Sequence, residues 1–185
     1  SHLGGTRNAM VMTWPKRIKD KGGLRSQFGY VSDVMPTILE AAGIKAPESV
    51  NGVKQKPITG VSLAYTFDNK KAPERHTTQY FEVFGNRSIY HNGWMASAFH
   101  GRLPWVGFDL NQKPLEEDVW ELYDLRADFS QAENLAAKNP AKLKELQAVF
   151  MQEAEANQLL PLRGQSLSKA GLPDPSGGRD EATYY

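Results

Sequence analysis

The dipeptide Asn92-Gly93 is the sequence feature that most constrains the fold of this chain. Asn followed by Gly readily adopts the positive φ angles of a two-residue turn, whose twist matches that of two antiparallel strands. The segments on either side, residues 88–91 and 94–98, have side chains that suit strands. The sequence therefore predicts an antiparallel β-hairpin near the middle of the chain.

Two further segments extend this hairpin into a sheet. Residues 78–84 are rich in aromatic and β-branched side chains, and residues 119–123 alternate along the chain. Both patterns are typical of strands. We predict a small antiparallel sheet of four strands, at residues 80–84, 87–90, 94–99 and 119–123.

The sequence after the sheet predicts an amphipathic helix. Asn139 is a cap residue, and Pro140 suits the first helical position because the N–H that it lacks would have no partner there. The apolar residues that then recur on one side are Leu143, Leu146, Phe150 and Ala154. We expect a helix at residues 140–156 that covers one face of the sheet.

The first part of the chain has a different pattern. Residues 9–14 form a continuous apolar run without alternation, which suits a strand covered on both faces. A helix is predicted at residues 34–42, with Ser32 or Asp33 as its cap and Gly43 just past its end. Its expected buried face consists of Met35, Ile38, Leu39 and Ala42.

The composition excludes several classes of function. With 22 Lys and Arg against 21 Asp and Glu, the chain has no net basic charge that would indicate nucleic acid or an anionic membrane as a partner. The absence of cysteine removes disulfides, thiolate metal sites and a cysteine nucleophile. No apolar run approaches the roughly 20 residues of a membrane helix.

Several motifs, in their order and spacing, resemble type I sulfatases and especially bacterial arylsulfatases. Three lie in the first part of the chain: Gly4-Gly5-Thr6-Arg7 with Trp14-Pro15, Asp33-Val34-Met35-Pro36-Thr37-Ile38 with Ala41-Ala42-Gly43, and Gly60-Val61-Ser62-Leu63. Two more follow: the stretch from Tyr80-Phe81-Glu82 to Trp94, and Trp120-Glu121-Leu122-Tyr123-Asp124-Leu125 with Asp128 and Asn134-Leu135-Ala136.

This resemblance implies the C-terminal part of an arylsulfatase-type sulfuric ester hydrolase. The expected fold is α/β, with an α+β second half. Residues 1–70 would end the alkaline phosphatase-like catalytic domain, residues 71–162 would form the antiparallel-sheet subdomain with its helix, and residues 163–185 would be an extended tail. The family also implies a periplasmic or secreted bacterial enzyme.

The same resemblance identifies what the chain lacks. Such sulfatases use a formylglycine made within a Cys/Ser-x-Pro-x-Arg motif, and a calcium ion that polarises the sulfate. The motif is absent, and Asp68-Asn69 falls in a polar loop rather than in the family's calcium site. We therefore expect no catalytic nucleophile and no metal ligand in this chain, no activity alone, and the missing N-terminal half as its partner.

Three residues are candidates for binding the small sulfate ester in the intact enzyme. His2 and Arg7 flank the Gly-Gly turn, which in the family follows a sulfate-binding lysine, and His91 could border a substrate cleft from the hairpin. Arginine also suits bidentate pairing with an acidic partner. No pair of histidines has the spacing of a helical zinc site.

Two other interpretations stay open at this point. The chain could be a free-standing binding or assembly module with the sulfatase C-terminal fold, or part of a related phosphate or phosphonate ester hydrolase. Where no other part of the protein covers the apolar run at residues 9–14, we expect one of three outcomes: the chain self-associates through this run, it keeps a missing fragment bound, or the run is disordered.

Overall fold

The computed structural model describes residues 2–83, 85–100 and 114–162. These residues form two compact units: unit 1 contains residues 2–8 and those from 78 onward, and unit 2 contains residues 9–77. The predicted tail at residues 163–185 lies outside the described residues. No helix in the described part combines the length and apolar character that a membrane crossing requires.

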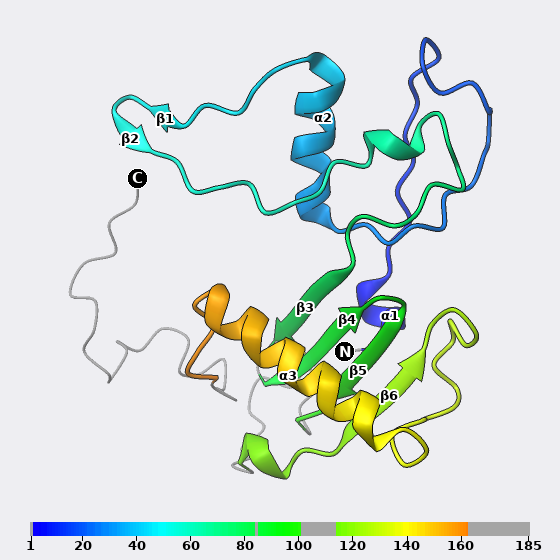
Figure 1. Ribbon diagram of the computed structural model, residues 1–185, viewed down its shortest axis with the longest axis vertical. Helices are drawn as coiled ribbons and strands as arrows, with labels where there is room; N and C mark the ends of the chain where they lie inside the picture. Colours follow the sequence, from blue (N-terminus) through cyan, green and yellow to red (C-terminus); the bar gives the residue numbers. More distant parts are fainter. Residues whose placement is uncertain (1, 84, 101–113, 163–185) are drawn as a thin grey trace. The chain divides into compact units, whose positions relative to one another are not determined.

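The centre of unit 1 is an antiparallel sheet (Figure 1). Its strands, in spatial order, are β3 (Thr78–Val83), β4 (Asn86–His91), β5 (Trp94–Ala98) and β6 (Trp120–Asp124). The turn between β4 and β5 has φ angles of 49° at Asn92 and 80° at Gly93, as the Asn-Gly pair predicts. The predicted sheet is therefore confirmed, with strand ends shifted by one or two residues. The short 3₁₀ helix η3 (Leu115–Glu117) precedes β6.

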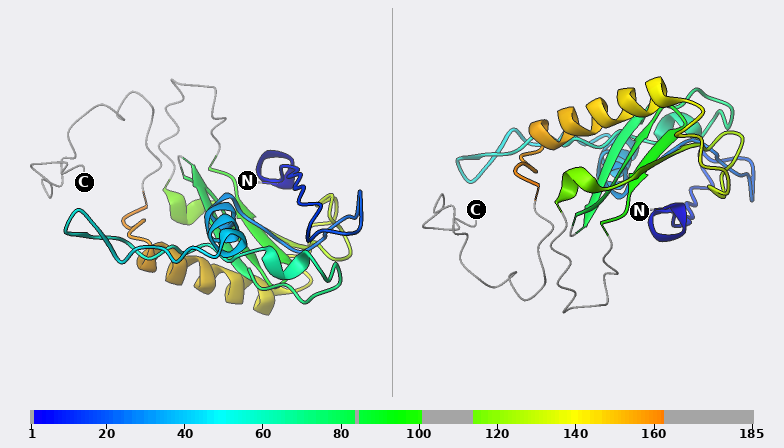
Figure 2. Two further views of the ribbon diagram at one scale, coloured as in Figure 1. Left: turned by 90° about the horizontal axis from the view of Figure 1, so that it is seen from above. Right: turned by 90° about the horizontal axis from the view of Figure 1, so that it is seen from below.

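Helix α3 (Pro140–Ala156) covers one face of this sheet, and its bounds confirm the prediction (Figures 1 and 2). The register places Tyr80, Ile89, Ala96 and Leu122 in one row across the four strands. The buried core joins that row to Leu146, Phe150 and Ala154 of the helix. The rings of Trp120 and Phe150 meet edge to face with centroids 5.8 Å apart. This apolar layer is the main core of unit 1.

Unit 2 is built from short elements joined by loops. Helix α2 (Val34–Ala42) confirms the predicted helix, and Gly43 ends it with a φ of 69°. The other elements are the 3₁₀ helices η1 (Val31–Asp33) and η2 (Ala64–Thr66), and a small hairpin of β1 (Ser49–Val50) and β2 (Val53–Lys54).

Three local predictions in unit 2 are wrong. Residues 9–14 form no strand, and Val11 is 92% exposed. A strand needs a neighbouring backbone with which to exchange hydrogen bonds, and no described segment of this chain pairs with it.

The expected buried face of α2 is also open, since Met35 is 58% and Ile38 61% exposed. The only buried residue of this helix is Thr37. Finally, the Asp33 side chain does not cap α2, because other donors occupy its carboxylate. Unit 2 therefore holds its helix by polar contacts and leaves the apolar side without a cover among the described residues.

Replacing Phe150 tests the packing of α3 on the sheet. Phe150→Ala should lower the free energy of unfolding by about 3–5 kcal/mol, because it removes a fully buried ring and leaves a cavity. The measurement is urea denaturation followed by circular dichroism. Met151→Ala, at the neighbouring exposed position, is the control and should change stability by no more than about 0.5 kcal/mol. Equal effects of the two variants would contradict the assigned helix face.

Candidate functional site

The Gly-Gly turn at the start of the chain packs in unit 1, near β6. Helix α1 (Leu3–Thr6) and α3 lie on opposite sides of the sheet (Figure 2). His2 Nε2 lies 2.6 Å from Glu121 Oε2, and the imidazole ring meets the ring of Tyr123 edge to face at 5.3 Å. The N–H of Leu3 donates to Oε1 of Gln131 over 2.5 Å. Residues more than a hundred positions away in the sequence therefore fix this turn.

Arg7 follows the same turn and packs on the segment after β6. Its guanidinium carbon lies 5.6 Å from the centre of the exposed Phe129 ring. A cation–π contact at an exposed site stabilises by about 0.5–1 kcal/mol. The structure thus brings His2 and Arg7 into one unit, next to β6 and the loop after it.

Tyr123 lies beneath His2 in an environment that keeps its phenol neutral. Burial, followed by a hydrogen bond to the Glu121 carboxylate, raises the pKa of Tyr123 from 10.0 to about 12. The negative charges of Glu121 and Asp128 act in the same direction. At neutral pH the phenol therefore stays protonated beside the Glu121 carboxylate, which also contacts His2. This cluster can orient the turn, but it contains no activated nucleophile.

His91 lies at a different place, at the end of β4. Its Nδ1 is 2.8 Å from Oγ1 of Thr78, and its Nε2 is 2.9 Å from Nδ2 of Asn92. The register pairs His91 with Trp94, which belongs to the face covered by α3, whereas Glu121 and Tyr123 belong to the other face. The structure therefore does not bring His91 together with His2 and Arg7. Substrate binding by these three residues stays a prediction.

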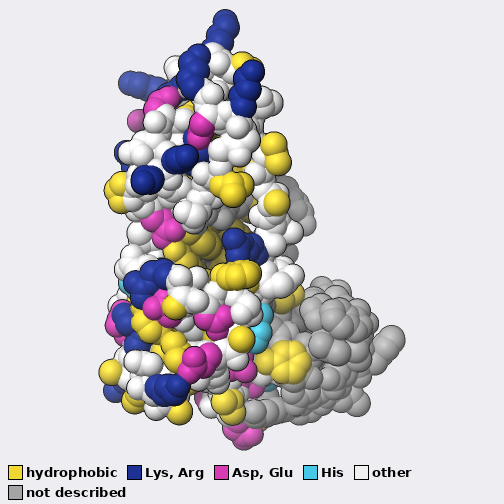
Figure 3. Space-filling model, turned by 90° about the vertical axis from the view of Figure 1, so that its right-hand side faces the viewer, with side chains coloured by type: hydrophobic (Ala, Val, Ile, Leu, Met, Phe, Trp, Pro, Cys, Tyr) yellow, Lys and Arg dark blue, Asp and Glu magenta, His cyan; other side chains and the backbone are white. Residues whose placement is uncertain are grey.

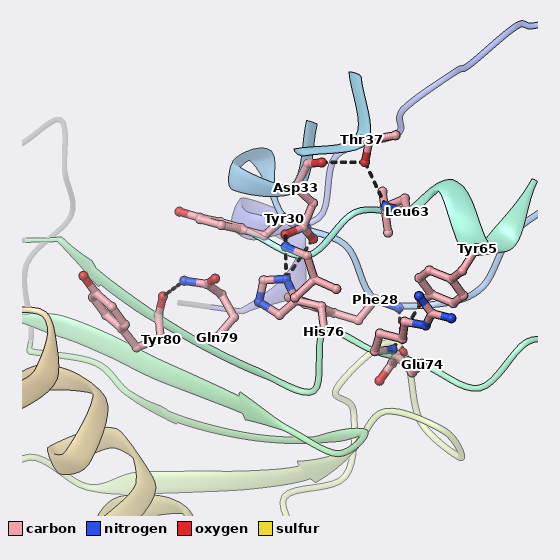
Figure 4. A network of polar contacts seen from close by, with 12 residues as sticks. Phe28, Tyr30, Asp33, Thr37, Leu63, Tyr65, Glu74, His76, Gln79 and Tyr80 are labelled. Carbon is pink, nitrogen blue, oxygen red and sulfur yellow. Dashed lines mark hydrogen bonds and ion pairs between the residues drawn. The ribbon is translucent and has the colours of Figure 1, made fainter. Parts of the chain in front are cut away.

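In unit 2, donors converge on the fully buried carboxylate of Asp33 (Figure 4). The N–H of Val61 donates to Oδ1 over 2.7 Å, and the N–H of Tyr30 donates to Oδ2 over 2.8 Å. Nδ1 of His76 lies 2.8 Å from both oxygens. The edge of the Phe28 ring meets the ring of His76, with centroids 5.3 Å apart. Such saturation allows a carboxylate to be buried at low cost.

Thr37 and Gly60 complete the connection between α2 and the loop that follows it. The Thr37 hydroxyl donates to the Asp33 carbonyl over 2.6 Å and accepts the N–H of Leu63 over 2.8 Å. A Cβ on Gly60 would lie 2.0 Å from the carbonyl oxygen of Ser32, so only glycine fits. These contacts explain why the motifs at residues 33–37 and 60–63 occur together. The contact of His76 with Asp33, by contrast, could not be predicted from the sequence, because 43 residues separate the two side chains.

A second buried charge cluster lies in unit 1. Nη1 of Arg87 donates to Oδ2 of Asp118 over 2.7 Å, and Nδ1 of His100 lies 3.0 Å from the same oxygen. Arg87 also donates to the carbonyls of Gly85 and Leu115, over 2.9 and 2.6 Å. This cluster joins β4, the end of β5 and η3, so its role is structural.

The His, Asp and Glu side chains of the described residues do not gather into a cluster of metal ligands. No group of three or more His, Asp or Glu side chains lies close enough together there to hold a metal ion.

Substitution of Gly60 tests the link between the two motifs. Gly60→Ala should destabilise the chain by about 1–3 kcal/mol or more, because the new methyl group overlaps the Ser32 backbone, which has little room to move. Gly5→Ala is the control, since a Cβ there meets nothing within 4 Å. Chemical denaturation of both variants measures the difference. An unchanged midpoint for Gly60→Ala would show that the loop is not held against α2.

The raised pKa of Tyr123 predicts a pH dependence of stability. The unfolded chain loses this proton near pH 10 and the folded chain near pH 12, so the free energy of unfolding should fall as the pH rises through that window. Glu121→Gln should lower the pKa toward 10.0, because the carboxylate that accepts the phenol proton is gone. The measurement is ultraviolet absorbance against pH, with Tyr123→Phe subtracted to isolate this residue. An unchanged titration in Glu121→Gln would exclude that hydrogen bond.

Comparisons with known proteins identify the family. The family described as N-sulphoglucosamine sulphohydrolase, C-terminal, matches residues 4–159. An N-acetylglucosamine-6-O-sulfatase from Bacteroides thetaiotaomicron is 28% identical over 152 residues, which cover 82% of this chain and 25% of that protein. The uncharacterized sulfatase YdeN of Escherichia coli is 27% identical over 185 residues, covering 85% of this chain and 31% of YdeN.

Among solved structures, the crystal structure of Ps i-CgsB is similar with a TM-score of 0.47 and 20% identity, over 75% of this chain and 27% of that one. The chain thus spans between a quarter and a third of the length of the relatives it matches. The family match extends over most of the described residues and includes every motif noted above. The chain belongs to the C-terminal family of the N-sulphoglucosamine sulphohydrolases and is a sulfatase C-terminal domain.

Proposed function

We propose that this chain is the C-terminal part of a sulfuric ester hydrolase whose remaining part supplies the chemistry. The formylglycine nucleophile and the calcium ligands of such enzymes then belong to that remaining part. The family match and the small share of each relative that the chain covers support this proposal. The observation that carries it is the exposed apolar surface of unit 2.

That surface has the character of an interface rather than of a solvated face. Val11 and its neighbours Met10 and Met12 are exposed, as are Met35 and Ile38 of α2. Consecutive exposed apolar side chains, such as those of residues 10–12, indicate a segment that another part of a protein covers. Residues 9–13 also have no backbone hydrogen bond among the described residues, and a neighbouring strand would satisfy these groups. We infer that the rest of the sulfatase covers these residues.

Unit 1 supports this function by holding the turn that carries His2 and Arg7. In the sulfatases that the sequence resembles, this turn follows a sulfate-binding lysine, so fixing it fixes one side of the sulfate pocket. Glu121 and Gln131 provide that support through His2 and Leu3. We also propose that His2 or Arg7 makes a polar contact with the substrate. His91 could contact the substrate only from the other face of the sheet, opposite to Glu121 and Tyr123.

The relatives favour a substrate in which the sulfate ester is carried by a sugar. One of them is an N-acetylglucosamine-6-O-sulfatase, and it matches most of this chain. We therefore propose a sulfated saccharide as the substrate class, in place of the aryl ester that the sequence resemblance suggests. A periplasmic or secreted location is also proposed, because polymeric sulfated saccharides occur outside the cytoplasm.

Reconstitution tests this function. The chain alone should not turn over p-nitrophenyl sulfate with or without calcium, because its described residues lack an activated nucleophile and a metal site. Co-expressed with the preceding part of its parent protein, it should co-purify as a complex that releases sulfate from a sulfated saccharide. Turnover by the chain alone that is lost on mutating one of its own residues would contradict the proposal.

Val11→Lys provides the matched test of the interface. This substitution should prevent formation of the complex, because it would bury a charged side chain where residues 9–14 pair with the other part. Val119→Lys, at a position in unit 1 that is 76% exposed, should leave the complex intact. In the absence of the other part, copies of the chain should associate through residues 9–14, so light scattering should give a larger mass for the wild type than for Val11→Lys. Equal assembly of both variants would exclude residues 9–14 as the interface.

A further inference from the structure

Charge is unevenly distributed along the chain, although the total is close to neutral. The whole chain has a formal charge of +1. Residues 9–77, which form unit 2, contain eleven Lys and Arg against six Asp and Glu, a net charge of +5. Fields from such a local excess act on partners that approach that unit, whatever the total charge. The near-neutral charge of the whole chain therefore does not reveal the net positive charge of unit 2.

Most of this excess comes from two loops that the structure brings together. Arg25 of the first loop donates to the carbonyls of Thr66 and Phe67 of the second, over 2.7 and 3.2 Å. Arg17 donates to Asp68 over 3.2 Å, and its guanidinium lies 5.6 Å from the centre of the Phe67 ring. We call the cationic surface of these loops the basic patch; it consists of Lys16, Arg17, Lys19, Lys21, Lys70 and Lys71.

The acidic residues of these loops are already occupied. Arg25 holds both carboxylate oxygens of Asp20, over 2.7 and 2.8 Å, and Arg17 holds Asp68. Arg25 lowers the pKa of Asp20, and the charge of Lys70 adds to that effect. Among the described residues, no carboxylate forms an ion pair with Lys16, Lys21, Lys70 or Lys71, and all four are exposed. The positive charge of the patch is therefore open to solvent.

The space-filling view shows this crowding directly. In its upper part, which is unit 2, dark blue Lys and Arg side chains project from the surface, with few magenta carboxylates among them (Figure 3). Lysine side chains of this kind act as flexible point charges and suit a partner that carries many anionic groups along its length.

We propose that the basic patch binds the sulfated saccharide chain on which the substrate ester is carried, an inference that rests on the proposed function. Sulfate groups are ionised at all ordinary pH values and recur along such a chain, so several lysines can engage at once. Single-stranded nucleic acid fits less well, because its unpaired bases stack on free aromatic faces. The two aromatic rings beside the patch are engaged: Trp14 and Phe67 meet each other at 6.1 Å and both contact Arg17.

Binding of a heparin-derived octasaccharide to the full chain tests this inference. Isothermal titration calorimetry should show an affinity that falls steeply with salt, because counterions are released from the polyanion. The triple variant Lys19→Ser, Lys21→Ser and Lys70→Ser should weaken binding by about tenfold or more. The matched control is Lys45→Ser, Lys54→Ser and Lys56→Ser, which removes the same charge from exposed positions of the same unit. It should weaken binding by no more than about twofold.

Three results would overturn the inference: no binding of the octasaccharide, equal weakening by the two triple variants, or tighter binding of a single-stranded DNA of equal charge. The reconstituted complex separates this inference from the proposed function. There, the patch variant should raise the KM for a sulfated polysaccharide and leave hydrolysis of p-nitrophenyl sulfate unchanged. If the wild-type complex does not cleave either ester, the proposed function fails, while octasaccharide binding by the chain still decides the role of the patch.

Discussion

The carboxylate of Asp33 is the point on which the organisation of unit 2 depends. It accepts one N–H from the segment before α2 and one from the loop at residues 60–63, and it pairs with His76 near the end of the unit. An ionised carboxylate in a buried position is tolerated only when its oxygens are fully bonded. The three segments must therefore assemble together, because the absence of any one leaves a buried acceptor without a partner. Thr37 adds a further link between α2 and the loop, because its hydroxyl accepts the N–H of Leu63.

The two units are stabilised by different kinds of interaction. Unit 1 has a continuous apolar layer between sheet and helix, to which the buried pair of Arg87 and Asp118 is added at one end. Unit 2 has a small apolar core that includes Leu63 and Phe67, and it relies on hydrogen bonds and ion pairs between its loops. A unit that leaves Val11, Met35 and Ile38 exposed gains little from burying these side chains on its own. The proposed cover by the rest of the sulfatase would offset this deficit.

The sequence predicted the elements whose structure is decided locally. The Asn92-Gly93 turn and the apolar stripe of α3 depend on neighbours a few residues away, so both appear as expected. The contacts of Asp33 and of His2 could not be predicted, because their partners lie up to 119 residues away and carry no periodic signal. The strand at residues 9–14 failed for another reason. Its pattern is typical of a segment buried against a neighbouring strand, and the described residues provide no such strand. The proposed remaining part of the sulfatase would provide it.

The basic patch shows a division of roles between arginine and lysine. Arg17 donates to the Asp68 carboxylate of the adjoining loop. Arg25 donates to the Thr66 carbonyl of that loop and, with two nitrogens, to both oxygens of Asp20 in its own loop. Such bidentate geometry suits partners whose positions do not change. The lysines, which have no comparable directional demand, extend into solvent from the frame that the arginines hold. On such a surface, each lysine places its charge at the end of a flexible side chain, while the arginines hold the loops that carry these side chains. The surface can follow sulfates at irregular spacing along a polymer, and its affinity grows with the number of charges engaged rather than with the fit of any single one.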